Sequence, residues 1–153
     1  MNRVLARRLN QVFGRVTNPE FLASKGLANE IAYHIFDYPA RDEKQLREHL
    51  PKLWKELERH QPPIHFQHFD LYEEMLNYLD HRNLLHRVLD IDQVQTDTEV
   101  LKKVRSAVNE EKLTRYLSER HDLEAQQLIF LSGAGKVRPV IRCWANPPAA
   151  PQP

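Results

Sequence analysis

The sequence predicts an α/β domain with a small, mostly parallel sheet of about three strands and helices on both sides. Three runs rich in branched and aromatic residues have the length of strands, and amphipathic helical patterns separate them. Parallel strands need long crossover connections, so this alternation is typical of βαβ units. We therefore expect a three-layer arrangement in which the strands all end at one edge of the sheet.

The first element is an amphipathic helix over residues 3–16. Its apolar positions recur at helical spacing: Val4, Leu5, Leu9, Val12, Phe13 and Val16. Four arginines (Arg3, Arg7, Arg8 and Arg15) lie largely on the other side and are typical of a solvated face. A turn-rich connector with Asn18-Pro19 and Gly26 leads to "IAYHIFDY", residues 31–38, the first predicted strand. Its apolar residues on both faces suggest that helices cover it.

A helix is predicted after Pro39, where "RDEKQLREHLPKLWKELERH" carries a leucine stripe and acidic residues in its first turn. Pro51 lies inside this helix and should bend it. Pro62-Pro63 ends the helix, and "IHFQHFDL", residues 64–71, predicts the second strand.

The pattern of "LYEEMLNYLDHRNLLHRVL" shifts phase near Asp80, which indicates two helices. Thr96 or Thr98 can cap the following helical stretch, whose apolar positions extend over more than one segment. "QQLIFLSG", residues 126–133, is the third predicted strand. We expect residues 1–142 to form a single domain and the proline-rich residues 143–153 to be a disordered tail.

Composition excludes several classes of protein. Lysine and arginine number 22 against 21 acidic residues, so the net charge of +1 is far from that of a dedicated nucleic-acid binder. Cys143 is the only cysteine, which excludes an intramolecular disulfide and favours a reducing compartment, so we expect a cytoplasmic protein. The sequence shows no apolar run long enough for a membrane span and no secretory signal pattern, so we expect no membrane contact.

The candidate site is the expected common edge of the sheet. Asp37, Asp70 and Ser132-Gly133 would end the three strands there, with Gly135 and Lys136 in the turn beyond. Glycines, a lysine and aspartates are residues that could hold phosphate and magnesium. A P-loop, however, needs a hydroxyl residue directly after the lysine, and Val137 stands there.

Structural roles explain the same residues. Asp70 and Glu73 have the spacing of a helix capping box, and Lys136 could form a salt link to Asp37 or Asp70. The histidines show no H-E-x-x-H pattern, and His65 and His68 should lie on opposite faces of a strand. We therefore expect no metal, no cofactor and no catalytic residue.

Three stretches together resemble one family: "FLASKGLANEIAYHIFDYPARDE", "HFQHFDLYEEML" and "LIFLSGAGKVRPVIR". They are similar to the BrxB proteins of BREX phage-exclusion systems, from the first helix to Arg142. The combination of K-G-L-x-N-E-I, I-F-D-Y, D-L-Y and F-L-x-G-x-G-K-V-x-P-x-I-R is specific, although each piece alone is weak.

The resemblance implies a cytoplasmic component of a bacterial antiviral defence system. Its expected partners are a PglZ-type phosphatase-like protein, a large BREX ATPase and a DNA methyltransferase, and its expected role is that of a non-catalytic adaptor, with any nucleic acid reached only indirectly. A degenerate nucleotide or phosphate site at Gly133–Lys136 is the alternative. Direct DNA binding through the helix 3–16 arginines and through Lys136, Arg138 and Arg142 is the third hypothesis. The edge residues, including Arg138 and Arg142, are equally candidates for a partner contact.

The resemblance ends after Arg142. Family members continue there with a Ser-His pair, another helix and at least one more strand, whereas this sequence continues with "CWANPPAAPQP". We therefore expect that the C-terminal part of the family domain is missing, through truncation or a frame shift after Arg142, and that the remaining sheet has an exposed edge.

Overall fold

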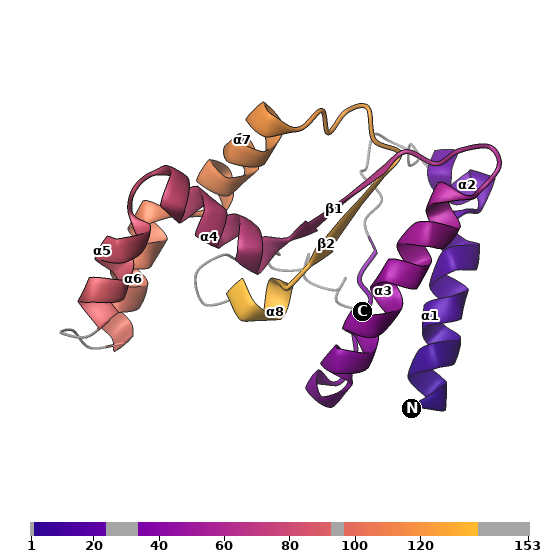
Figure 1. The fold of residues 1–153 in the computed structure, drawn as a ribbon, viewed down its shortest axis with the longest axis horizontal. Helices are drawn as coiled ribbons and strands as arrows, with labels where there is room; N and C mark the ends of the chain where they lie inside the picture. Colours follow the sequence, from indigo (N-terminus) through magenta and orange to yellow (C-terminus); the bar gives the residue numbers. More distant parts are fainter. Residues whose placement is uncertain (1, 24–33, 93–96, 138–153) are drawn as a thin grey trace, which may run out of the picture. The chain divides into compact units, whose positions relative to one another are not determined.

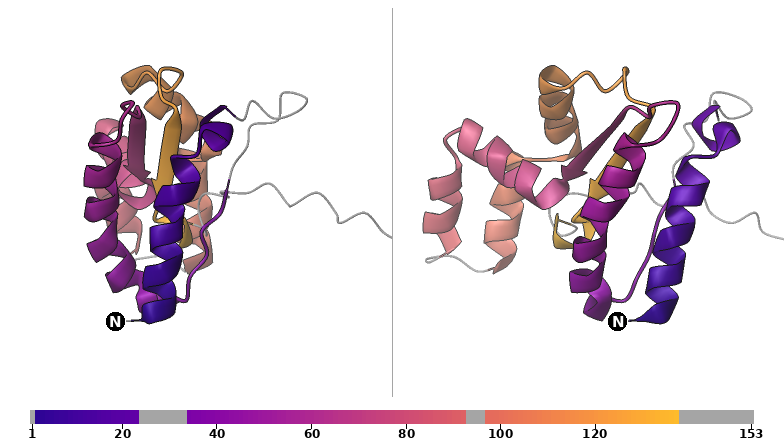
Figure 2. Two further views of the ribbon diagram at one scale, coloured as in Figure 1. Left: turned by 90° about the vertical axis from the view of Figure 1, so that its right-hand side faces the viewer. Right: turned by 45° about the vertical axis from the view of Figure 1, so that its right-hand side comes forward.

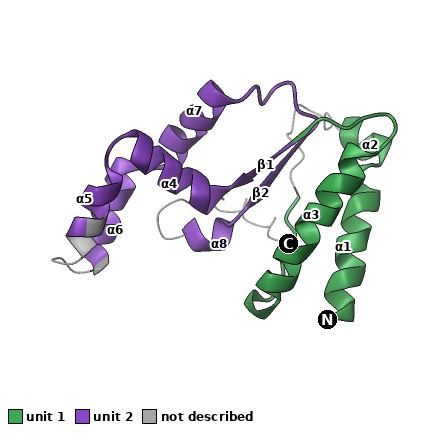
Figure 3. Cartoon of the chain, viewed as in Figure 1, with its two compact units in different colours: residues 1–66 green, residues 67–153 purple. Residues whose placement is uncertain are grey.

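The computed structural model describes residues 2–23, 34–92 and 97–137. Within them the chain forms two compact units, residues 1–66 and residues 67–153 (Figure 3). The assignment of residues 1–142 to a single domain stays a prediction. The expected tail at 143–153 and the possible cap Thr96 lie outside the described residues.

The first unit is built on two long helices, α1 (Arg3–Val16) and α3 (Glu43–Glu58). A short α2 (Pro19–Ala23) follows α1, and a 3-10 turn (Ala40–Asp42) precedes α3. Leu5 and Leu9 of α1 pack with Leu46 of α3 in a small core. The helix expected over residues 3–16 and the helix expected within residues 41–60 are confirmed, with Pro51 inside α3.

Asn2 joins the beginnings of α1 and α3. Its side-chain oxygen accepts hydrogen bonds from the backbone N–H groups of Val4 and Leu5, which makes it the N-cap of α1. The same side chain donates to Asp42 Oδ2 over 2.9 Å, and the backbone N–H of Asn2 donates to Gln45 Oε1 over 3.0 Å. Asn2 therefore links the N-terminal ends of α1 and α3 by hydrogen bonds.

The prediction of a strand at residues 31–38 is wrong for the described residues 34–38. Residues 34–39 are described without strand pairing, and residues 31–33 lie outside the described part. Phe36 and Tyr38 pack against the core of α1 and α3, while Ile35 is 57% exposed. The segment is buried on one face only, because it lies along a helix pair. The Tyr38 hydroxyl donates to Glu43, and burial together with this carboxylate raises the pKa of Tyr38 to about 12.

The second unit holds a two-stranded sheet of β1 (Phe66–Asp70), which begins at the last residue of the first unit, and β2 (Leu128–Ser132). The strands run side by side in the same direction (Figures 1 and 2). The α/β class, a parallel sheet and the predicted strands at 64–71 and 126–133 are confirmed. The sheet has two strands among the described residues in place of the expected three.

Helices connect the two strands. They are α4 (Leu71–His81), α5 (Leu85–Asp92), α6 (Asp97–Ala107) and α7 (Glu110–Arg120), and a short α8 (Ala134–Val137) follows β2. The phase shift near Asp80 does separate two helices, because the chain turns at Asn83 with a positive φ of 54°. The expected division of the later helical stretch is also confirmed.

The core of the second unit lies between these helices and one face of β1. Phe69 of β1 belongs to one buried cluster with residues of α4, α6, α7, α8 and the α6–α7 connection: Leu71, Met75, Tyr78, Leu79, Val104, Val108, Leu113, Leu117 and Val137. Leu79, Val108 and Val137 are almost completely buried. These contacts fix α8, and so the end of β2, against α4.

Replacing Leu79 by alanine should lower the free energy of unfolding by about 2–5 kcal/mol, because it leaves a cavity in this core. Leu131→Ala is the matched control, since Leu131 is 58% exposed, and it should change stability by less than about 0.5 kcal/mol. Urea unfolding followed by circular dichroism measures both. Equal losses for the two variants would contradict this core assignment.

Candidate functional site

The structure brings five residues together where β1 and β2 end: His68, Asp70, Ser132, Gly133 and Lys136. We call them the strand-end cluster. Asp70 is the last residue of β1, and Ser132 is the last residue of β2. Because the two strands are parallel neighbours, their carboxyl ends lie at one edge of the sheet, as the sequence predicts for this pair.

Asp70 is the N-cap of α4. Its Oδ1 accepts hydrogen bonds from the backbone N–H groups of Tyr72, over 3.0 Å, and Glu73, over 3.3 Å. The capping role expected from the spacing of Asp70 and Glu73 is confirmed for Asp70. This oxygen is therefore already occupied by two donors of the first helical turn.

Gly133 lies directly against the Asp70 carboxylate. Its φ is +74°, in the left-handed region that favours glycine. A Cβ at this position would stand 2.6 Å from Asp70 Oδ1 and 3.4 Å from the backbone nitrogen of Tyr72. Both the backbone conformation and the available space therefore require glycine here, without any ligand.

Gly135 and Lys136 belong to helix α8, so the prediction of a turn at these residues is wrong. The backbone N–H of Lys136 donates to the Gly133 carbonyl over 3.0 Å, which closes a helical turn. A Cβ on Gly135 would meet nothing within 4 Å. Val137, fully buried, anchors this short helix in the core.

Lys136 lies over an aromatic ring. Its Nζ is 5.7 Å from the ring centroid of Tyr72, in cation–π geometry. The predicted salt link to Asp37 or Asp70 does not form among the described residues: Asp37 pairs with Arg8 in the first unit, over 3.0 Å.

His68 of β1 and Ser132 of β2 are joined by a hydrogen bond between their side chains. His68 Nε2 and Ser132 Oγ are 2.8 Å apart. Burial lowers the pKa of His68, and the nearby Asp70 carboxylate partly opposes this shift. The lowered pKa favours the neutral imidazole, whose unprotonated nitrogen can accept a hydrogen bond from the Ser132 hydroxyl. No local sequence signal predicts that His68 and Ser132 meet, because they are 64 positions apart and only the parallel alignment of the strands brings them together.

Asp37 is not part of a sheet edge, which corrects its predicted place at the end of a strand. Its side chain is 90% exposed beside Arg8, whose guanidinium also lies 4.8 Å from the Phe36 ring centroid. Arg8 is therefore held by contacts within its own unit, whereas Arg3, Arg7 and Arg15 are solvent-exposed. The two C-terminal candidates, Arg138 and Arg142, lie outside the described residues.

The strand-end cluster lines neither of two clefts that lie in the described part of the chain. One lies beside Asn2, Arg8 and Arg41 in the first unit, and the other lies between α5 and α6 in the second. Among the described residues no three metal-binding side chains are grouped, and none of the helices has the length and apolar character to cross a membrane.

Comparison with known proteins identifies the family. The family model for BREX protein BrxB matches residues 67–145. A BREX protein BrxB of Bacillus cereus (strain H3081.97) is 33% identical over 144 residues, which covers 92% of this chain and 73% of that protein. The chain belongs to the BrxB family. A BREX protein BrxB of Escherichia coli O9:H4 (strain HS) is 36% identical over 140 residues, covering 91% of this chain and 68% of that protein.

The BrxB resemblance found in the sequence is thereby confirmed, and membership implies a role in phage defence. The strand-end cluster lies within the matched residues 67–145. No solved structure matches the chain.

Gly133→Ala should lower the free energy of unfolding by at least about 1–2 kcal/mol, because alanine is strained at this φ and its methyl group would collide with Asp70. Gly135→Ala is the matched control: it lies in a helix with free space and should be neutral or stabilise by up to about 1 kcal/mol. Chemical denaturation measures the pair. Similar effects of the two substitutions would contradict the contact of Gly133 with Asp70.

Acid should destabilise the protein partly through His68. Folding lowers the pKa of His68, so below about pH 6.5 the unfolded state binds more protons than the folded state. The free energy of unfolding therefore decreases as the pH is lowered below this value. Above about pH 6.5 the imidazole is neutral in both states and has no such effect. The wild type should therefore lose more stability between pH 7.5 and pH 5.5 than His68→Gln, which keeps a polar partner for Ser132 but cannot titrate. Urea unfolding at both pH values tests this, and equal losses would refute it.

Proposed function

We propose that this chain is a non-catalytic adaptor of a BREX phage-defence system and acts through protein contacts. The first support is that the polar groups of the strand-end cluster have structural partners. Asp70 caps α4, His68 bonds Ser132, and Lys136 lies on Tyr72. A ligand at this edge would have to compete with these contacts.

The observation that carries the proposal is the exposed apolar face of β2. Ile129 is 45% exposed and Leu131 is 58% exposed, and their alternation with Phe130 puts both on the same face of the strand. A partner surface that covers these two neighbouring apolar side chains would stabilise the complex by about 25 cal/mol per Å² of apolar area removed from water. This face suits a protein partner better than a small polar ligand.

The partners we propose are other BREX proteins. Those implied by the family resemblance are a PglZ-type protein, the large BREX ATPase and the DNA methyltransferase. The contact would use the Ile129 and Leu131 face and would leave the Gly133–Lys136 segment free. We also propose that the chain works in the cytoplasm, in line with its single cysteine, Cys143.

The two alternatives stay predictions. Nucleotide binding at Gly133–Lys136 gains no support, because Gly133 is packed on a carboxylate and α8 has only four residues. Direct DNA binding by α1 has Arg3, Arg7 and Arg15 in its favour as exposed cations, while Arg8 is paired with Asp37. In the adaptor role, by contrast, the chain would reach nucleic acid only indirectly, through its partner proteins.

The adaptor role is tested by affinity purification of the tagged chain from a strain that carries its complete BREX system. Replacing both Ile129 and Leu131 by threonine should reduce the recovered BREX proteins by about tenfold or more, because apolar contact area is lost. Threonine keeps the strand propensity of these positions. Val4→Gln on α1 is the control, since Val4 has the same 58% exposure as Leu131.

Recovery of no BREX protein with the wild-type chain would refute the adaptor role. Unchanged recovery with the double variant would refute the assigned surface. Circular dichroism of each variant checks that the fold is retained.

A further inference from the structure

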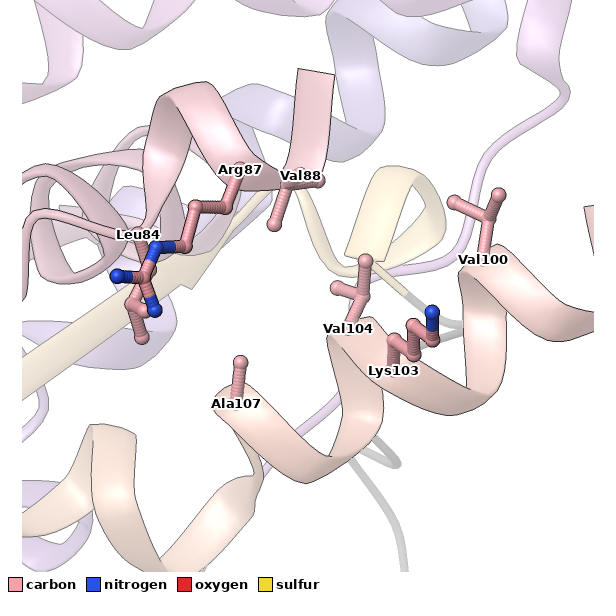
Figure 4. Close-up of a pocket in the computed structure, with 7 residues that line it drawn as sticks. All are labelled: Leu84, Arg87, Val88, Val100, Lys103, Val104 and Ala107. Carbon is pink, nitrogen blue, oxygen red and sulfur yellow. The ribbon is translucent and has the colours of Figure 1, made fainter. Parts of the chain in front are cut away.

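A second feature of the BrxB-matched unit is the cleft between α5 and α6. It is lined by Leu84, Arg87, Val88, Val100, Lys103, Val104 and Ala107 (Figure 4). The two helices lie side by side (Figures 1 and 2). The strand-end cluster and the exposed face of β2 contribute none of these residues, so the cleft is a separate surface.

The floor of the cleft is apolar and only partly covered. Val104 is buried in the core, whereas Leu84, Val88, Val100 and Ala107 are partly buried and pack against that core from outside. Figure 4 shows Val88 and Val104 extending from the two helices into the space between them. A pair of helices with an apolar groove between them is the surface on which a third amphipathic helix packs.

The edges of the cleft are positively charged. Arg87 on α5 and Lys103 on α6 are both exposed, and neither forms an ion pair within the described part of the chain. The residues that line the cleft include no acid. An apolar floor between two available cations is complementary to apolar side chains flanked by carboxylates. A nucleic-acid backbone would match the cations but not the floor.

We propose that this cleft binds an acidic amphipathic helix of another BREX protein. Apolar side chains of that helix would cover the floor between Val88 and Val104, and its aspartates or glutamates would contact Arg87 and Lys103. The inference rests on the proposed adaptor function and deepens it, because it gives the chemistry of one partner segment. The cleft and the exposed face of β2 would then be two separate docking surfaces.

Charge reversal tests the cations. Arg87→Glu combined with Lys103→Glu should reduce recovery of one BREX protein by about tenfold, because two attractive contacts become repulsive. Arg82→Glu combined with Lys102→Glu is the matched control: it makes the same change in net charge at exposed residues that do not line the cleft. Equal recovery with both double variants would overturn the proposal.

Carbodiimide cross-linking of the wild-type complex identifies the contact, because this reagent joins an amine directly to a carboxylate. Mass spectrometry should find Lys103 joined to an Asp or Glu within an amphipathic helical segment of a BREX protein. The cross-link should disappear with Lys103→Arg, which keeps the charge but lacks the reactive amine. Lys103 joined only to a second copy of this chain, or to no protein, would overturn the proposal.

The two proposals fail in different ways. If threonine at Ile129 and Leu131 lowers recovery while the reversed charges at Arg87 and Lys103 do not, the adaptor role stands and the cleft inference is wrong. If the wild-type chain recovers no BREX protein, the adaptor role is wrong and the cleft inference falls with it.

Discussion

The close approach of Gly133 to Asp70 is the constraint on which the second unit depends. Asp70 ends β1 and caps α4 with the same oxygen that lies against the Gly133 backbone. A side chain at position 133 would collide with the Asp70 carboxylate, so either this carboxylate or the backbone at position 133 would have to move. Burial of Val137 and the position of Lys136 over Tyr72 follow from this contact. One glycine and one carboxylate thus fix two strands and two helices at a single point.

This constraint gives structural roles to residues that make the edge of the sheet resemble a ligand site. The glycine serves packing, the aspartate serves capping, and the lysine lies on an aromatic ring. His68 and Ser132 satisfy each other across the two strands. Two exposed surfaces of the second unit have a different character: the outer face of β2 is apolar, and the cleft between α5 and α6 is apolar with positively charged edges. Exposed apolar surface of this kind is typical of sites that contact other proteins.

Helices and two of the strands could be predicted because their signals are local. Leucine spacing, the proline pair at 62–63 and the phase shift near Asp80 depend only on neighbouring residues. The segment 34–38 has the composition of a strand but is not one, because a strand requires a partner that supplies its hydrogen bonds. Phe36 and Tyr38 are instead used to cover the α1 and α3 pair. The same composition therefore predicts Asp37 at a sheet edge that does not include it.

The sequence by itself determined the α/β class, the order of most elements, the capping role of Asp70 and the BrxB family, because periodicity, spacing and motif are properties of the linear chain. The tertiary structure alone decided which polar residues meet. It paired His68 with Ser132, placed Gly133 on Asp70 and gave Lys136 an aromatic partner in place of a carboxylate. It also placed Arg87 and Lys103 beside an apolar cleft, where neither has an ion pair among the described residues. Such contacts join residues up to 64 positions apart, and their geometry is set by how strands and helices pack, which local sequence does not encode.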